Sequence, residues 1–207
     1  MPGLNISRRL PEFKRGDEQF HRRGNSDGFT VGDYWQWMGS DLLSNLQRGV
    51  LAEFIVARIL NDTYHCRHEW DSFDVQTEDL ETLEVKSAAH VQSWHLAHPD
   101  EYKPSEIRFR IAPKKSTERR AANGYVFCVL GNPYEIPDPL DLTQWVFYAI
   151  TTNALDKQCP KQLSIGLRSL QKLNELYTAN YHELPVVVKE MFRRDPLKGE
   201  LIRPDTS

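Results

Sequence analysis

The sequence of 207 residues has few cysteines and no long apolar run. Its cysteines, Cys66, Cys128 and Cys159, form no Cys-x-x-Cys pair, and an odd number cannot all pair within one chain. Such usage is typical of a reducing compartment. The first residues lack the apolar core of a signal peptide, and no apolar stretch approaches the length of a membrane span. We therefore expect a cytoplasmic protein. Glycine-rich phosphate loops are missing as well, which argues against an NTPase.

Charge is nearly balanced, with a formal net charge of -3, but it is unevenly distributed. Acidic residues crowd into the segment QTEDLETLE. Basic residues gather in two patches: Arg8, Arg9, Lys14, Arg15, Arg22 and Arg23 in the first, and Lys114, Lys115, Arg119 and Arg120 in the second. Two basic patches beside an acidic segment can hold a polyanion near a metal-binding centre. Solvated loops of mixed charge are the alternative for either patch taken alone.

The order of apolar patterns predicts one α/β domain. Residues 1–38 lack apolar periodicity and are expected to form an irregular lead-in, with the segment YWQW as its docking point. Residues 40–60 have helical apolar spacing, with Ser40 as candidate N-cap. Strand-like runs follow, and the chain ends in a helical pattern, LRSLQKLNELY, and a weaker one, VVVKEMFRR. We therefore expect residues 39–207 to form a single domain with a mixed central β-sheet flanked by helices.

The segment TLEVKSAAHVQSW places Glu84 and Lys86 on one face of an expected strand, with apolar residues on the other. A Glu-x-Lys triplet alone carries little information, because chance produces it about once in a chain of this length. The sequence supplies its own control, since Glu12 and Lys14 have the same spacing outside any apolar run. Only the second copy lies in a candidate strand.

An aspartate precedes that strand. Asp74 lies between Phe73 and Val75, and a hairpin through the loop TEDLE would bring it close to Glu84. Two close carboxylates repel unless a cation lies between them, and a hard ion such as Mg²⁺ with oxygen ligands meets that need. The alternative is an edge residue beside an acidic loop, and Asp71 is a rival for the same role.

Two further polar residues stand near these positions in the pattern. Glu53 borders the apolar face of the first helix, so it requires a cation, a hydrogen-bond network or an ion pair with Arg48 or another basic group. Gln92 follows the Glu-x-Lys strand, and its amide can position a phosphate oxygen or a water. An exposed surface glutamine is the alternative.

Together these residues resemble the PD-(D/E)xK nuclease superfamily, which has the restriction-endonuclease-like fold. The resemblance covers Arg48 to Gln92: RGVLAEFIVARIL is similar to the first core helix, SFDV to the aspartate strand, and LEVKSAAHVQ to the Glu-x-Lys strand with its glutamine. Phe73 stands where the family has its proline. The nearest likeness is to small bacterial and phage-type members.

The resemblance implies a metal-dependent deoxyribonuclease, expected to be an endonuclease that leaves a 5′-phosphate. Asp74, Glu84 and the Val85 carbonyl would bind Mg²⁺, with Mn²⁺ able to substitute, and Glu53 would support the metal directly or through water. Lys86 would orient or deprotonate the attacking water, and Gln92 would fix the water or the phosphate. The expected contacts to the nucleic-acid backbone are Lys114, Lys115, Arg119, Arg120 and Arg48.

Two other functions compete with this one. A non-catalytic member of the same fold would bind nucleic acid or protein, and loss of a core ligand would mark it. A metal module of another class would use His65, Cys66 and His68, or His90, His95 and His98, although neither group has structural zinc spacing. We also expect a homodimer, because cutting both strands of a duplex commonly takes two sites.

Overall fold

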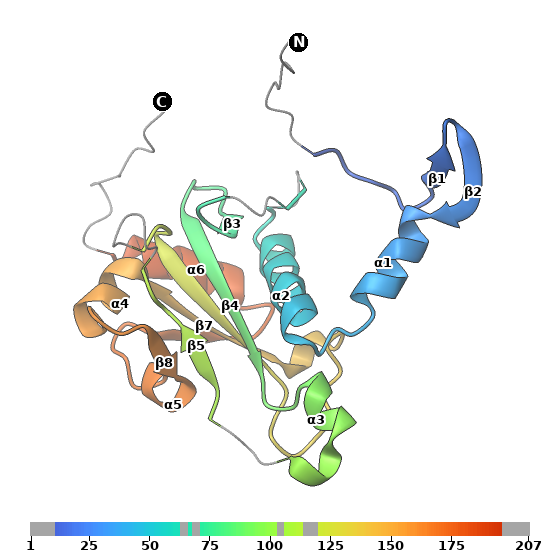
Figure 1. Cartoon of the computed structure of the whole chain (residues 1–207). Helices are drawn as coiled ribbons and strands as arrows, with labels where there is room; N and C mark the ends of the chain where they lie inside the picture. The colour runs from blue at the N-terminus through green and yellow to red at the C-terminus, as the bar shows by residue number, and fades with distance from the viewer. Residues whose placement is uncertain (1–10, 63–65, 68–70, 103–105, 114–119, 196–207) are drawn as a thin grey trace, which may run out of the picture.

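The centre of the molecule is a five-stranded mixed sheet with strand order β3-β4-β6-β7-β9 (Figure 1). The computed structural model describes residues 11–62, 66–67, 71–102, 106–113 and 120–195. β4 and β6 are parallel, whereas the other neighbours are antiparallel. The strands of this sheet are β3 (Val75–Gln76), β4 (Thr82–Ala89), β6 (Gly124–Leu130), β7 (Trp145–Thr151) and β9 (Tyr177–Ala179). The expected α/β domain with a mixed central sheet is confirmed.

Helices and a small second sheet cover the two faces of the central sheet (Figure 1). On one face, Leu83 and Val85 pack with α2 (Asn45–Ile59) and α6 (Leu184–Arg193). A Cβ at Gly124 would lie 3.0 Å from the ring of Phe192 on α6, so this helix needs a glycine there to approach β6. The other face is covered by β5 (Arg108–Arg110) paired with β8 (Ser164–Gly166), α4 (Thr152–Gln158) and α5 (Leu167–Leu170).

Helix α2 follows the predicted apolar pattern but starts later. Its N-cap is Ser44, whose hydroxyl accepts from the backbone N–H of Gln47 at 3.4 Å. The predicted cap, Ser40, is instead the C-cap of the preceding helix, α1 (Val31–Gly39). Ala52, Ile55 and Val56 are buried at the spacing expected for one helix face. The remaining elements are α3 (Ser93–Ala97) and the 3-10 helices η1 (Pro99–Glu101) and η2 (Leu142–Gln144).

The expected helix over LRSLQKLNELY is wrong for most of its length. Only α5 is helical, and Glu175 then takes a left-handed backbone conformation with φ of 59°. The Gln158 Nε2 donates to the Asn174 carbonyl, and the Gln158 Oε1 accepts from the Asn174 N–H. The chain then continues into the edge strand β9. Tertiary contacts override the helical pattern here. The weaker pattern VVVKEMFRR does form α6, which starts at Leu184 with Pro185 in its first turn.

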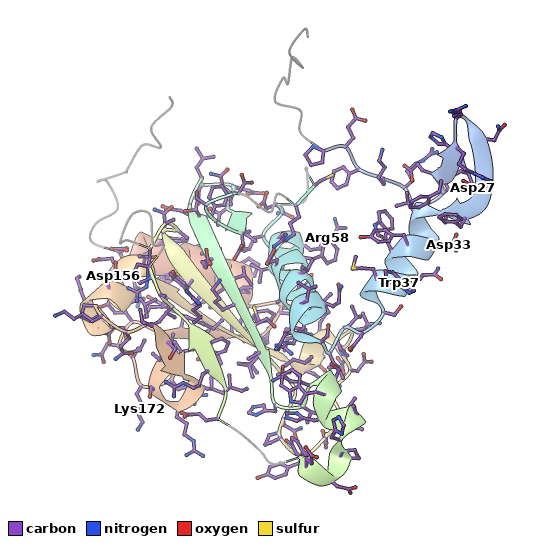
Figure 2. All side chains as sticks on the ribbon, viewed as in Figure 1. Asp27, Asp33, Trp37, Arg58, Asp156 and Lys172 are labelled. Carbon is purple, nitrogen blue, oxygen red and sulfur yellow. The ribbon has the colours of Figure 1, made fainter. Side chains whose placement is uncertain are left out.

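The N-terminal arm (residues 11–39) is regular, contrary to the expected irregular lead-in. It forms a hairpin of β1 (Gln19–Arg22) and β2 (Asn25–Thr30) followed by α1 (Val31–Gly39), which Thr30 and Asp33 cap reciprocally. None of these residues is buried. Trp37 is 84% exposed, so the segment YWQW does not dock on the domain as predicted. Figure 2 shows Asp27, Asp33 and Trp37 on this projecting part. No helix in the described part of the chain has the length and apolar character required to cross a membrane.

Deletion of residues 1–39 tests whether the domain depends on its arm. Because the arm contributes no buried residue, we expect the melting temperature of the remaining domain to change by less than about 3 °C, as for a loss below about 1 kcal/mol. In contrast, Leu184→Ala removes a fully buried side chain and is expected to cost about 2–5 kcal/mol. Thermal unfolding followed by circular dichroism measures both. A deletion as harmful as Leu184→Ala would contradict the assignment of an independent arm.

Candidate active site

The β3–β4 hairpin brings Asp74 to the edge of β4, as the sequence predicted. The backbone N–H of Asp74 donates to the Leu83 carbonyl at 2.9 Å, and the carboxylate oxygen Oδ2 accepts from the Val85 N–H at 2.7 Å. The connecting loop closes with a bond of 2.8 Å from the Thr77 N–H to the Glu81 carbonyl. Asp74 is half-buried, whereas its rival Asp71 is exposed, so the geometry favours Asp74.

The carboxyl group of Asp74 is in an environment that disfavours its charge. Burial raises its pKa to about 6, and repulsion from Glu84 acts in the same direction. The charge of Glu53 raises this pKa further, while the Val85 N–H and Lys86 lower it. The charge of Glu84 is therefore close enough to disfavour the ionisation of Asp74, which is the condition that a bound cation relieves.

Glu84 and Lys86 form an ion pair on one face of β4. The Lys86 Nζ lies 2.5 Å from the Glu84 Oε1, and the two side chains are only 29% and 21% exposed. Their neighbours Leu83 and Val85 point to the opposite face and are buried. The alternation predicted from the sequence is confirmed, and it separates a charged face from a core face within one strand.

The Val85 carbonyl lies at the same strand edge as Asp74. In a strand, the N–H and C=O of one residue point toward the same edge, and the Val85 N–H donates to Asp74. β3 extends only over Val75–Gln76, so it does not pair with β4 beyond Leu83. The carbonyl oxygen of Val85 is thus directed to the edge at which the Asp74 carboxylate lies, as the expected ligand role requires.

Glu53 pairs with Arg67 rather than with Arg48. The guanidinium Nε and Nη2 contact the two carboxylate oxygens, the second pair at 3.1 Å. The structure therefore shows the alternative in which Glu53 forms an ion pair with a basic group other than Arg48. Glu53 still adds negative charge near Asp74, whose pKa it raises. In this arrangement its carboxylate is held by Arg67.

Arg48 and Gln92 contact each other, and both lie away from the charged face of β4. The Gln92 Oε1 accepts from the Arg48 Nη1 at 2.9 Å, and the Arg48 Nε donates to the Ser87 hydroxyl at 3.1 Å. Ser87 alternates with Lys86, so this network lies on the α2 side of the sheet. Arg48 also donates to Asn45 and to the Leu43 carbonyl.

Two predictions are corrected by this network. Arg48 is 3% exposed, so it is not a surface contact for nucleic acid. Burial lowers its pKa to about 10, which leaves it charged at neutral pH among neutral acceptors. The side-chain oxygen of Gln92 is bound to this guanidinium and not presented to Glu84 or Lys86. Its role is to join α2 to the start of α3, for which it is the N-cap residue.

Arg120 is also a structural residue rather than a backbone contact. It is 7% exposed, and its guanidinium donates to Asp156 and to the carbonyls of Ile111, Cys159 and Gln162. Figure 2 shows Asp156 on α4, where it meets this guanidinium. The other members of the second basic patch, Lys114, Lys115 and Arg119, lie outside the described residues.

The fit of a metal can be judged from the donors present. Within the described ranges, no group of three or more His, Cys, Asp or Glu side chains is arranged to hold a metal ion. Asp74 and the Val85 carbonyl at the β3 edge of β4, with Glu84 on the adjoining face of the strand, provide two carboxylates and one neutral oxygen. Mg²⁺ is commonly held by one or two carboxylates, with waters and substrate phosphates completing its shell. The donor set therefore fits Mg²⁺, and Mn²⁺ as its substitute.

Other chemistries find no comparable arrangement in the described residues. The predicted histidine groups assemble no metal site there, and His65 and His68 lie outside those residues. Gly24, Ser26 and Gly28 have Gly-x-Ser-x-Gly spacing, but they lie in the exposed β1–β2 hairpin. A nucleophile elbow requires a strand-to-helix turn, so this run is not one.

Comparison with known proteins does not assign the chain to a family. No family model, curated protein or solved structure matches it.

Sequence reasoning missed two residues beside the acidic pair. Arg67 reaches Glu53 from the segment that also contains His65, Cys66 and His68. Tyr125 is the register partner of Glu84 on the parallel strand β6. No local pattern marks either residue, because both contacts depend on how distant segments meet.

Replacing Asp74 by Asn tests the unfavourable charge. The pKa of this carboxyl is higher in the folded protein than its ordinary value of 3.8, so its contribution to stability is complete below pH 4 and is lost as the pH rises through about 6. At pH 8 without metal, Asp74→Asn is expected to stabilise the fold by about 2 kcal/mol, since Asn keeps an acceptor for the Val85 N–H. At pH 4 the difference should vanish.

Urea unfolding in EDTA at both pH values measures this effect. Asp79→Asn, an exposed change in the same hairpin loop, is the matched control and should be nearly neutral. Equal effects of Asp74→Asn at pH 4 and pH 8 would refute the electrostatic account.

Arg120→Ala tests the corrected role of that residue. The substitution leaves buried carbonyls and Asp156 without their donor, so we expect a loss of about 2–4 kcal/mol in the free energy of unfolding. Chemical unfolding at neutral pH is the measurement. Arg108→Ala, at an exposed arginine on β5, should have little effect. A stable Arg120→Ala protein with weakened nucleic-acid binding would restore the original prediction.

Proposed function

We propose that this protein is a metal-dependent phosphodiesterase of the PD-(D/E)xK type with a restriction-endonuclease-like fold. One observation carries the proposal: strand pairing holds the half-buried Asp74 beside Glu84 and its partner Lys86. The substrate that we propose is DNA, cut internally, by a cytoplasmic protein that acts as a homodimer.

The electrostatics of the edge support a cation-binding role. Asp74 and Glu84 would hold Mg²⁺ together with the Val85 carbonyl. A bound Mg²⁺ supplies charge neutralisation at the non-bridging phosphate oxygens and makes a water more acidic. The burial of Asp74 and its repulsion from Glu84, which together raise the pKa of Asp74, would favour the uptake of a cation by these two carboxylates.

Lys86 is the residue that acts on the substrate in this proposal. In the free protein its ammonium is bound to Glu84. If Glu84 bound a cation, the ammonium of Lys86 would be available to orient the attacking water and to stabilise negative charge developing on the phosphate oxygens. The water oxygen bonds to phosphorus while the bond from phosphorus to O3′ breaks. The products are a 3′-hydroxyl and a 5′-phosphate.

Cleavage assays with matched variants test the function. Plasmid, linear duplex and single-stranded DNA are incubated with Mg²⁺, Mn²⁺ or EDTA. We expect metal-dependent cutting by the wild type, and a loss on the order of 100-fold or more in both Glu84→Ala and Lys86→Ala. The second Glu-x-Lys triplet provides the control: Glu12→Ala changes an exposed glutamate at the same place in its triplet and should cut normally.

The pattern of results separates the competing functions. A folded wild type that binds these DNA substrates without cutting them in either metal would favour the non-catalytic binding module. Equal loss in the Glu12 and Glu84 variants would show that the triplet in β4 has no special role.

A further inference from the structure

Tyr125 lies next to the candidate metal ligand Glu84. In the parallel β4–β6 ladder, Glu84 pairs with Tyr125 and Lys86 with Phe127, so these side chains share one face of the sheet. Neighbouring strands are about 4.8 Å apart. The ring of Tyr125 stacks against Phe127, with centroids 5.7 Å apart and planes inclined by 17°, which fixes it within the sheet face.

The hydroxyl of Tyr125 has no structural use that the described residues reveal. The residue is only 4% exposed, and its hydroxyl donates no hydrogen bond within the described part of the chain. A buried phenol normally finds a partner, because burying an unpaired polar group costs free energy. Tyr148 on β7 provides the contrast: it is 8% exposed, and its hydroxyl accepts from the Gln171 Nε2 at 2.8 Å.

The charges around Tyr125 identify a suitable acceptor. Burial and the negative charge of Glu84 both raise the pKa of this phenol, and Asp74 acts in the same direction. The group therefore remains a proton donor at neutral pH. The other charges that act on the phenol are Asp156, which also raises its pKa, and the partner of Asp156, Arg120, which lowers it.

We propose that Tyr125 is a positioning residue of the same site, whose hydroxyl donates to the Glu84 carboxylate once a bound cation has released Lys86 from it. This inference rests on the proposed function. In the free protein the ammonium of Lys86 binds the Glu84 Oε1, and the phenol makes no hydrogen bond to Glu84. When Lys86 turns away, Glu84 would lose its donor, and Tyr125 replaces it. Partners of this kind orient a metal-binding carboxylate and tune its affinity.

Tyr125→Phe and Tyr148→Phe form a matched pair, since each removes one buried hydroxyl from the same sheet face. Mn²⁺ binding is measured by calorimetry, together with thermal unfolding in EDTA and kcat and KM for DNA cleavage. For Tyr125→Phe we expect Mn²⁺ binding weaker by about 10-fold or more and kcat lower by a similar factor. Its KM and melting temperature should not fall, because no existing hydrogen bond is lost.

Tyr148→Phe should show the opposite pattern. It leaves the Gln171 amide without its acceptor, so the melting temperature falls while Mn²⁺ binding and kcat stay unchanged. A Tyr125→Phe protein that binds Mn²⁺ as tightly as the wild type would overturn the role of Tyr125 and leave the proposed function intact. If the wild type binds Mn²⁺ without cutting DNA, the proposed function fails and the Mn²⁺ comparison still decides the role of Tyr125. A wild type that binds no Mn²⁺ overturns both.

Discussion

The bond between the Val85 N–H and the Asp74 carboxylate is the constraint on which the candidate site depends. Asp74 directly precedes β3, and its carboxylate accepts the Val85 N–H in place of a backbone carbonyl of a neighbouring strand. This contact fixes the carboxylate beside Glu84, where burial and repulsion raise its pKa. Without it, Asp74 would be an exposed loop residue, and its ionisation would cost the fold little.

The rest of the domain holds β4 rigid on both sides of that contact. Leu83 and Val85 are locked into the core beneath α2 and α6, and the β6 ladder runs along the other edge. At the far end of the strand, Arg48 ties Ser87 and Gln92 to the start of α2. A strand fixed in this way keeps the spacing of its charged side chains, which a site for phosphate chemistry requires.

Local patterns in the sequence were sufficient for the elements that depend on neighbouring residues. Three features depend only on residues that are close in the sequence: the alternation around Glu84 and Lys86, the hairpin that includes Asp74, and the apolar stripe of α2. The predictions failed where distant segments decide the structure. The helical spacing after Gly166 yielded to the edge strand β9, and the basic character of Arg48 and Arg120 gave no sign that their guanidinium groups would be buried. The partnerships of Arg67 with Glu53 and of Tyr125 with Glu84 depend on tertiary contacts and strand register, which no window of sequence contains.

The balance of charge at this edge explains why a divalent cation and a phosphodiester suit it together. Glu53, Asp74 and Glu84 are the acids, and Arg67 and Lys86 the bases, so the fully ionised group carries a net charge of minus one. The protein can avoid this charge only by protonating Asp74, whose raised pKa reflects that tendency. A divalent cation changes the net charge to plus one, and a single phosphodiester anion then neutralises it. In the proposed function, uptake of a cation would therefore create the attraction for the substrate, because a metal-free edge would repel a phosphate.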